Sequence, residues 1–590
     1  MVENLKNKIE NYKYFDIIVV LAIIVSSYFI MSIVSDYIGL YYDAVNPDHL
    51  APFILNKVKE GTNIFDLIYL GQVYHGVFNS YIMAFLIEVV GAPSASLLHF
   101  TSATYSSIIC IMIYKILRKC KVDKLLSAFI CVLTSLSTAL LCINITQFYV
   151  ELSGMVFEII GISIFIDYLK TNNIKKLLLV GLFSGLACYG YYNYALFIPA
   201  FIIIIIIHNI KNKNSIINSI MIYIPGILLG VLPYILGYSQ RVFGESSHKY
   251  LIYSSILLFM IIWIIYTYKV FQKDNKKKKI ISIIILIGII TFCILSYSNL
   301  LLTSLEAKSS NVNIGFFEKI TRLFDKYFGL VNSSTVEQRL FNKILFSAKN
   351  IINYISSFLF IFSVVISFIR YRRNKIKNNK ILYLFILVFV YFVLAFFISL
   401  SGLSEQHFVP MLFINSIVLS ISINYLISLI NNDKIKNIVK IIFYLFIMIG
   451  IGLNIYGNKL VVSNLYKTGG QNGAFSTKIN DISYDALDDK GRGIKDYYVF
   501  KEWGYDASFR YLTNESIPHI EDVNNNIKTK DILDNYIEDY QIIMICQNEN
   551  TKNSIINELD EYGDSINYSI KTIYERNGSL AYYKIVINNK

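Results

Sequence analysis

The sequence predicts a polytopic α-helical membrane protein of about 13 transmembrane helices, followed by a small α/β domain. Three observations lead to this prediction. The 590 residues are 55% hydrophobic and only 16% charged, with a mean hydropathy of +0.51. Apolar runs of about 20 residues, long enough to cross a bilayer as helices, recur along the first three quarters of the chain. Residues 458–590 are more polar and alternate short apolar runs with helical patterns.

The apolar runs define the transmembrane domain, residues 1–457. The first run follows Lys6, Lys8 and Lys13, but it is too long for a signal peptide and has no small-residue cleavage site. We therefore expect it to be retained as the first span. The expected spans are 15–38, 95–117, 124–143, 149–169, 175–190, 193–209, 214–237, 250–271, 280–302, 346–369, 381–402, 407–430 and 437–457.

Positive charge gathers in every second connection between these spans. Clusters of Lys and Arg occur at 115–124, 170–176, 211–213, 273–279, 370–380 and 434–436, whereas the alternate short connections carry few cations. Cytoplasmic loops are the ones that carry such an excess. This places the N-terminus in the cytoplasm, and it places loops 39–94 and 303–345 and the domain 458–590 outside. The formal net charge of +13 then reflects anchoring in the membrane, not nucleic-acid binding.

The composition also indicates the kind of organism that encodes the chain, and it argues against a disulfide-based fold. The 40 Phe and 46 Tyr against 2 Trp, with many Ile, Asn and Lys, indicate A/T-rich codons. We infer a bacterium with a low-GC genome, and hence a bacterial plasma membrane. The 7 Cys lie mostly in apolar runs and form no CxxC pair, so neither a disulfide framework nor a cysteine metal site is expected.

The C-terminal part reads as a small extracytoplasmic α/β domain. Residues 497–500, 541–546 and 580–587 have the apolar, β-rich character of buried strands. Residues 531–540 and 552–562 read as helices. Gly469, Gly470 and Gly473 mark a linker after the last span.

The strongest candidate site follows the first span. Asp43, Asp48 and His49 fall within seven residues, at the point where the chain leaves the bilayer. Pro47 precedes a segment, residues 49–60, that reads as an amphipathic helix. Asp48 alone would be explained as a helix cap. Its position at the membrane surface of a many-span protein favours a functional role, since ionisable groups there are costly.

Further candidates lie at the same expected height. His75 precedes an amphipathic segment that ends near Val90, which we expect to lie flat at the bilayer surface. Glu151 stands on one helical face with Gln147 and the deeper Glu158, and intramembrane acids usually face a cavity or a partner.

Two outer segments carry cations, imidazoles or a carboxylate that could contact a lipid-linked phosphate. They contribute Arg241 and Lys249 from one loop, and Glu405 and His407 from the segment that opens a late span. A plain interfacial charge explains each of them equally well.

Small residues at packing spacing occur from Gly181 to Gly190, and close contact between helices is the simplest explanation for them. The tyrosines from Tyr189 to Tyr194 follow at an outer turn, where Tyr also anchors helices at the interface.

These features together resemble the C-type (GT-C) glycosyltransferase superfamily, which includes protein O-mannosyltransferases and the lipid A aminoarabinose transferase. The similar segments are Asn46-Pro47-Asp48-His49 with its following helix, Tyr74-His75-Gly76, the stretch from Gly181 to Pro199, and Glu405 to Pro410. The family usually has Asp-Glu where this chain has Asp48-His49, and an arginine where it has His407.

The resemblance implies a polyprenyl-phosphate sugar donor and a glycan, lipid or protein acceptor. Asp48 would be the general base in a single inverting displacement, with Asp43 as the runner-up or a second carboxylate that shapes the site. His49, His75, Glu151 and Glu405 would contact substrate, and Arg241, Lys249 and His407 would hold the lipid phosphate. We expect no cofactor and metal-independent activity, although carboxylates can bind Mg²⁺ or Mn²⁺.

Two other functions fit a polytopic chain of this kind. A transporter or flippase of lipid-linked saccharides would carry charges near the bilayer midplane and inverted repeats. The sequence has few midplane charges, and we detect no repeat. A non-catalytic cell-envelope assembly protein would leave Asp48 dispensable.

Overall fold

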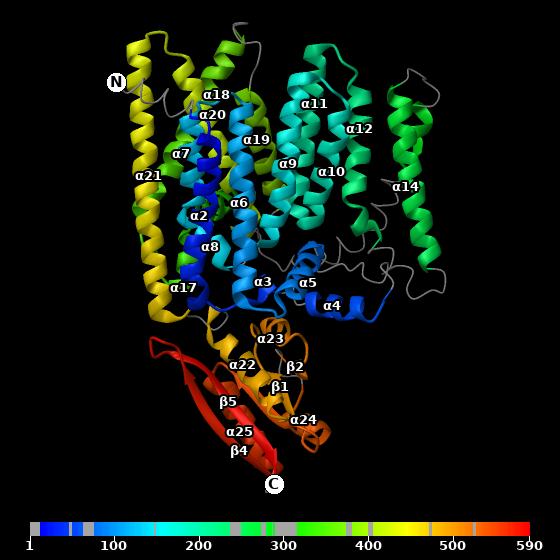
Figure 1. The fold of residues 1–590 in the computed structure, drawn as a ribbon, viewed down its shortest axis with the longest axis vertical. Coiled ribbons are helices and arrows are strands. Elements are labelled where there is room, and N and C mark those ends of the chain that lie inside the picture. Colours follow the sequence, from blue (N-terminus) through cyan, green and yellow to red (C-terminus); the bar gives the residue numbers. More distant parts are fainter. Residues whose placement is uncertain are drawn as a thin grey trace.

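The protein is a bundle of long helices with a compact α/β domain at one end (Figure 1). The computed structural model describes residues 12–45, 50–62, 76–146, 149–236, 249–272, 279–285, 287–288, 315–372, 380–398, 405–470, 475–522, 527–563 and 565–590. The long helices run roughly along the long axis of the molecule, and the C-terminal domain continues that axis (Figure 1).

Within the described ranges, 8 helical segments are long and apolar enough to cross a membrane. They are built on α2 (Phe15–Val34), α6 (Ala95–Lys119), α9 (Tyr149–Thr171), α11 (Phe197–Asn212), α18 (Ile351–Arg372), α19 (Lys380–Ile398), α20 (Val409–Ser428) and α21 (Asp433–Thr468). A bent pair, α7 (Lys124–Ser135) and α8 (Thr138–Thr146), makes up to 9. The polytopic helical class is thus confirmed, and the count of about 13 stays a prediction.

Two shorter apolar helices, α10 (Lys175–Gly190) and α12 (Ile216–Gly230), pack backbone against backbone. A Cβ on Gly226 would lie 2.2 Å from the carbonyl oxygen of Leu178, and one on Gly185 would lie 2.3 Å from that of Ile227. Only glycine permits this approach. The close helix contact predicted from the small residues is therefore confirmed, as is expected of packing in a membrane.

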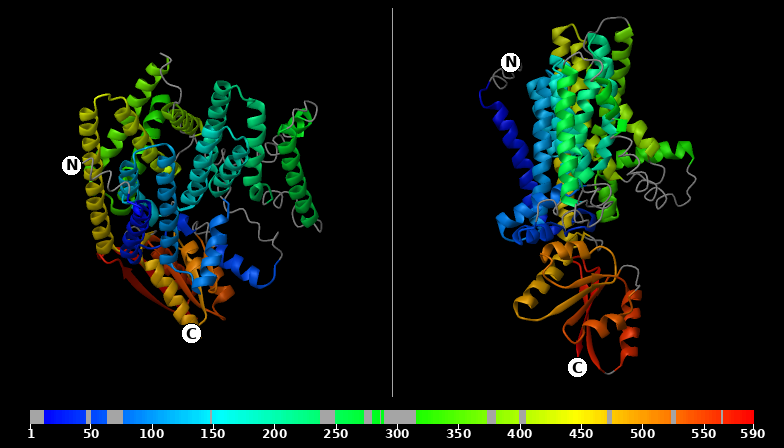
Figure 2. Two further views of the ribbon diagram at one scale, coloured as in Figure 1. Left: turned by 45° about the horizontal axis from the view of Figure 1, so that its top comes forward. Right: turned by 90° about the vertical axis from the view of Figure 1, so that its right-hand side faces the viewer.

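Short helices gather at the end of the bundle that faces the C-terminal domain. They are α3 (Tyr42–Val45), α4 (Leu50–Lys59), α5 (Phe78–Val90), α16 (Phe316–Val331) and α17 (Ser334–Phe341). Figure 2 shows α3 to α5 between the bundle and the C-terminal domain. The helix expected at residues 49–60 is α4. Helices α3 to α5 and α17, which belong to the two loops that charge alternation predicts on one side of the membrane, thus lie at the same end of the molecule as the C-terminal domain.

The C-terminal domain is built on a five-stranded mixed sheet in the order β2-β1-β3-β5-β4. Its elements are α22 (Lys478–Gly491), β1 (Asp496–Phe500), α23 (Asp506–Leu512), β2 (His519–Glu521), α24 (Thr529–Tyr536), β3 (Gln541–Cys546), α25 (Glu549–Tyr562), β4 (Ile566–Tyr574) and β5 (Leu580–Asn589). Strand β1 is parallel to β2 and β3, whereas β5 is antiparallel to β3 and β4. The three predicted strands are confirmed, and β2 and β4 are additional.

The domain is attached to the bundle by hydrogen bonds as well as by the chain. The Gly39 N–H donates to the Phe475 carbonyl at 2.8 Å, and the Ser508 hydroxyl donates to the Leu40 carbonyl at 3.0 Å. Helix α21 continues past the predicted boundary at 457/458 to Thr468, where Gly469 ends it at φ +69°. The boundary itself stays a prediction.

The glycine contact can be tested with Gly226→Val. We expect a loss of about 1–3 kcal/mol in stability, because the new side chain meets the backbone of α10. Thermal unfolding of the purified full chain would measure the loss. Gly452→Val in α21 is the matched control, since a Cβ at that position would have no neighbour within 4 Å. Equal melting temperatures for the two variants would contradict the proposed packing.

Candidate active site

The structure locates the sequence candidates of the first outer loop only in part. Asp48, His49, His75 and Arg241 lie outside the described residues. Asp43 belongs to α3 and Lys249 begins α14 (Lys249–Gln272), but their side chains are outside the described part. The site is therefore assembled from the described residues around them.

Aromatic side chains of the C-terminal domain hold the segment that leads to Asp48. Tyr41 stacks on Phe475 with ring centroids 4.6 Å apart, and Tyr42 packs on Trp503 at 5.0 Å. Helix α3, which carries Asp43, also packs against α23 of that domain. Aromatic pairs of this kind fix geometry as well as adding stability. The C-terminal domain thus positions the first outer loop.

The residues that follow His75 are fixed on the end of α10. The Gly76 N–H donates to the Tyr189 carbonyl at 2.7 Å, and the Val77 N–H donates to the Tyr189 hydroxyl at 3.3 Å. A Cβ on Gly76 would lie 2.2 Å from the Tyr189 ring, so this contact requires glycine. His75 therefore directly precedes a rigid attachment point at the same end of the bundle.

Glu405 is the centre of a charged cluster that the structure reveals. Its carboxylate is only 4% exposed and forms ion pairs with Arg339 of α17 and Lys326 of α16, the latter at 3.4 Å. The side chains of Arg339 and Lys326 are 37% and 42% exposed. A nearly buried glutamate is thus paired with two partly exposed cationic side chains.

A second, fully buried ion pair orients α17. Glu337 and Lys349 are 0% and 3% exposed, and the Glu337 carboxylate also accepts from the Ser333 hydroxyl at 2.7 Å and the Leu345 N–H at 2.8 Å. A buried carboxylate needs such partners. Arg339 lies two residues after Glu337 and hence on the opposite side of the helix, toward Glu405. The buried pair therefore positions the arginine.

His407 is fixed by its backbone rather than by its ring. Its carbonyl accepts from the Asn193 amide at 2.7 Å and from the Tyr391 hydroxyl, and Asn193 also donates to Tyr391 at 2.9 Å. The imidazole lies beside Tyr191, with ring centroids 5.9 Å apart. This network joins the turn before α11, helix α19 and the turn before α20.

Glu151 is connected to the same network. Its backbone carbonyl accepts from the Tyr194 hydroxyl at 2.5 Å, and Tyr194 adjoins Asn193. Glu151 is buried, as is the deeper Glu158. Glu151, His407 and Glu405 thus lie along one connected set of polar contacts at the end of the bundle near the C-terminal domain.

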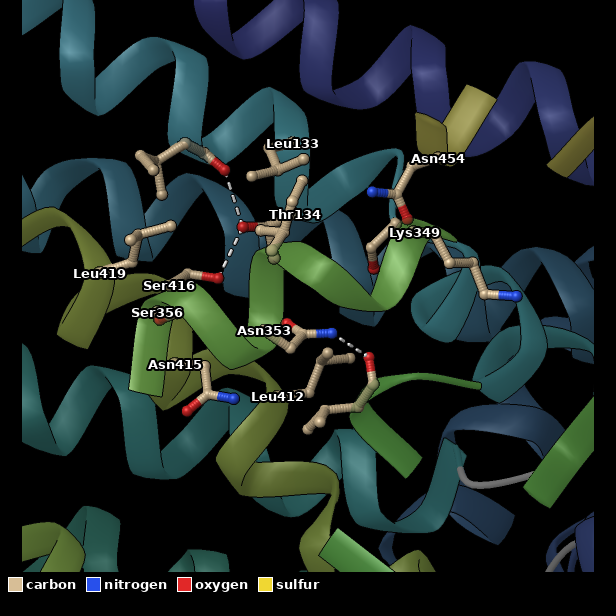
Figure 3. A pocket seen from close by; sticks show the side chains of 14 residues that line it. Leu133, Thr134, Lys349, Asn353, Ser356, Leu412, Asn415, Ser416, Leu419 and Asn454 are labelled. Carbon is tan, nitrogen blue, oxygen red and sulfur yellow. Dashed lines mark hydrogen bonds between the residues drawn. The ribbon is translucent and has the colours of Figure 1, made fainter. Parts of the chain in front are cut away.

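A small polar cavity inside the bundle is too small to hold a sugar. It is about 50 Å³ in volume and is lined by Thr134, Asn353, Ser416, Asn454 and neighbours (Figure 3). Thr134 and Ser416 hydrogen-bond at 2.7 Å, and the Asn353 amide donates to the Val331 carbonyl at 2.8 Å. This volume suits one or two waters.

The face of the C-terminal domain near α3 carries two carboxyl groups with raised pKa values. Burial raises the pKa of Asp506, against the effect of His519, whose Nε2 lies 3.4 Å from its Oδ1. Burial raises the pKa of Glu521 to about 7, and the negative charge of Asp506 adds to this rise. Asp506 begins α23, the helix that packs on α3. Among the described residues, no group of three or more His, Cys, Asp or Glu could hold a metal ion.

A protein-family model described as dolichyl-phosphate-mannose-protein mannosyltransferase matches residues 74–233. This family belongs to the C-type glycosyltransferase superfamily, so residues 74–233 are similar to part of a domain of that superfamily. Two of the segments that carry the resemblance, Tyr74-His75-Gly76 and the glycine-rich α10 region, lie inside the matched range. The Asp48 and Glu405 segments lie outside it. No curated protein matches the chain significantly.

Sequence reasoning missed the cations that neighbour Glu405. Arg339 and Lys326 stand on amphipathic helices in the long outer loop, where charge looks ordinary. Their partner is in a turn 66 and 79 residues away in the chain. A signal was present in the sequence. The short connections predicted on the outer side carry few cations, whereas the loop 303–345 on that side carries several.

Lys349→Met tests whether the buried pair supports the site. We expect a loss of about 3–5 kcal/mol, because an unpaired carboxylate remains buried. The double variant Lys349→Met with Glu337→Gln should recover part of that loss. Thermal unfolding of the full chain measures both. A single variant as stable as the wild type would show that the pair does not hold α17.

Proposed function

We propose that this chain transfers a sugar from a polyprenyl-phosphate-linked donor to an acceptor hydroxyl at the outer face of the membrane. The single observation that carries the proposal is the match of residues 74–233 to dolichyl-phosphate-mannose-protein mannosyltransferases. The arrangement of charge around Glu405 supports the same donor class. The acceptor is a glycan, a lipid or a protein.

Arg339 and Lys326 are the groups best suited to hold the donor phosphate. A sugar linked to a lipid through one phosphate carries a single negative charge, to which the cations of Arg339 and Lys326 are complementary. Cleavage leaves a monoester with further negative charge on its oxygens. Cations fixed beside those oxygens interact with them most strongly once this charge has developed, so they would stabilise the leaving group. Glu405 would orient both cations rather than touch the phosphate.

Asp48 is the proposed general base, and Asp43 is the alternative. The acceptor oxygen attacks the anomeric carbon while its proton passes to the carboxylate. The bond between that carbon and the phosphate oxygen breaks, and its electron pair leaves with the polyprenyl phosphate. One displacement inverts the configuration. The aromatic contacts of Tyr41 and Tyr42 support a fixed placement of the segment that carries both acids.

The location of the outer-loop helices and the C-terminal domain at one end of the bundle explains how donor and acceptor could meet. Helices α3 to α5, helix α17 and the C-terminal domain lie together at one end of the bundle (Figure 1), and Arg339 of α17 pairs with Glu405. Charge alternation predicts that this end is extracytoplasmic, where nucleotide sugars of the cytoplasm are absent. His49, His75 and Glu151 are proposed to contact the sugar or the acceptor, and Arg241, Lys249 and His407 to assist at the phosphate. The C-terminal domain is proposed to bind acceptor.

Asp48→Asn tests the base. We expect transfer from a defined polyprenyl-phosphate sugar to fall about 10²- to 10⁴-fold, with unchanged thermal stability, because the amide cannot accept the proton. Asp43→Asn run in parallel separates the two acids. Full activity in Asp48→Asn with loss in Asp43→Asn would reassign the base. Activity in both variants would refute a carboxylate base in this loop.

Arg339→Gln tests the phosphate contact. We expect the transfer rate to fall about 100-fold, because a fixed cation beside the leaving oxygens is lost. Arg322→Gln is the matched control, since that exposed arginine of α16 forms its ion pair with Glu318 and not with Glu405. Equal rates for the two variants would contradict the proposed phosphate site. Lipid translocation without sugar transfer by the wild type would favour the transporter instead.

A further inference from the structure

A half-open apolar cavity of about 130 Å³ lies at the opposite end of the bundle from the C-terminal domain. Its walls come from α6, α9, α11, α19 and α20, and they include Phe165, Phe201, Ile204, Leu387 and Ile417. Helices α9, α11 and α19 reach this upper end in Figure 1. An apolar void that stays empty destabilises a packed bundle in proportion to its volume.

Two lysines stand at the rim of this cavity. Lys170 ends α9 and donates to the Lys119 carbonyl, and Lys380 begins α19 and donates to the Cys120 carbonyl. Both carbonyls belong to the C-terminal end of α6, so a helix terminus gathers the ammonium groups at one point. An ammonium has three donors. Each of the two ammonium groups uses one of its three N–H donors in the described structure, and both Lys170 and Lys380 are exposed.

The carboxylate closest to this rim already has a partner. Asp167 pairs with Lys119 at 2.6 Å, and no described carboxylate forms an ion pair with Lys170 or Lys380. The third polar group at the rim, His208, hydrogen-bonds to Asn172 at 2.7 Å. The rim thus presents two ammonium groups with donors to spare, directly above an apolar cavity.

We propose that this cavity binds an anionic phospholipid, with its phosphate on Lys170 and Lys380 and an acyl chain against Phe165 and Leu387. Charge complementarity favours an anionic headgroup over a zwitterionic one, and the apolar walls suit a hydrocarbon chain. The site is at the end of the bundle away from the first outer loop and from Glu405. The occupant is therefore a lipid of the other leaflet, and not the sugar donor. This inference is independent of the proposed function.

Native mass spectrometry of the purified full chain tests the proposal. Protein incubated with equal amounts of phosphatidylglycerol and phosphatidylcholine should retain the former. Lys170→Gln with Lys380→Gln should weaken retention about fivefold for each lysine removed. Lys175→Gln with Lys434→Gln is the matched control, because it removes the same charge at the same end without touching the cavity. Leu387→Trp keeps the charges, fills the cavity and should also lose the lipid.

Three results would overturn the proposal. They are equal retention of the two lipids by the wild type, equal retention of phosphatidylglycerol by the double variant and its control, and displacement of phosphatidylglycerol by an equimolar polyprenyl phosphate. The last would assign the cavity to the carrier lipid. The wild type should also melt at a higher temperature in phosphatidylglycerol than in phosphatidylcholine. This comparison of melting temperatures requires no variant. Equal melting temperatures would count against the site.

Discussion

The arrangement of the candidate site depends on the burial of one carboxylate between two cations. Glu405 sits in the turn before α20, and it is nearly inaccessible to solvent. A charge so placed is stable only with partners of opposite sign. Arg339 and Lys326 supply them from α17 and α16, so the ion pairs bring a distant outer loop to the end of the bundle. Both cationic side chains remain partly exposed in these contacts.

The C-terminal domain is a structural part of this end of the molecule. Its Phe475 and Trp503 hold Tyr41 and Tyr42, and its Ser508 binds the backbone of Leu40. The hydrophobic core of the bundle also continues into the domain, through Tyr511 and Leu512. These contacts reduce the freedom of the segment that leads to Asp43 and Asp48. Holding a reacting group in place lowers the entropic cost of a bimolecular step.

Local patterns predicted the elements well. The run of apolar residues after Phe15 and the short apolar run that ends at Phe500 each identify an element from its own sequence. The glycines of α10 likewise predicted a close helix contact from the local sequence alone, because a residue without a side chain allows another helix to approach. Strand β4 was missed because its outward face is polar, with residues such as Ser569 and Lys571.

The site was harder to predict because its contacts join remote parts of the chain. Nothing near Glu405 in the sequence indicates that Arg339 pairs with it, and nothing near Tyr41 indicates Trp503. Such pairs follow from packing of the whole bundle, which periodicity does not encode. The charge pattern predicts that the outer segments lie on one side of the membrane, and their described helices α3 to α5 and α17 lie at one end of the bundle. This prediction of sidedness depends on the distribution of many lysines and arginines, and therefore not on any single contact.

The most direct test of the central claim is the anomeric configuration of the product, measured by NMR. The purified chain would be supplied with a panel of polyprenyl-phosphate hexoses of known configuration and with glycan, lipid and peptide acceptors. We predict a transferred sugar of inverted configuration, with release of polyprenyl phosphate. Retained configuration, or turnover of a nucleotide sugar with none of the lipid-linked donors, would contradict the account.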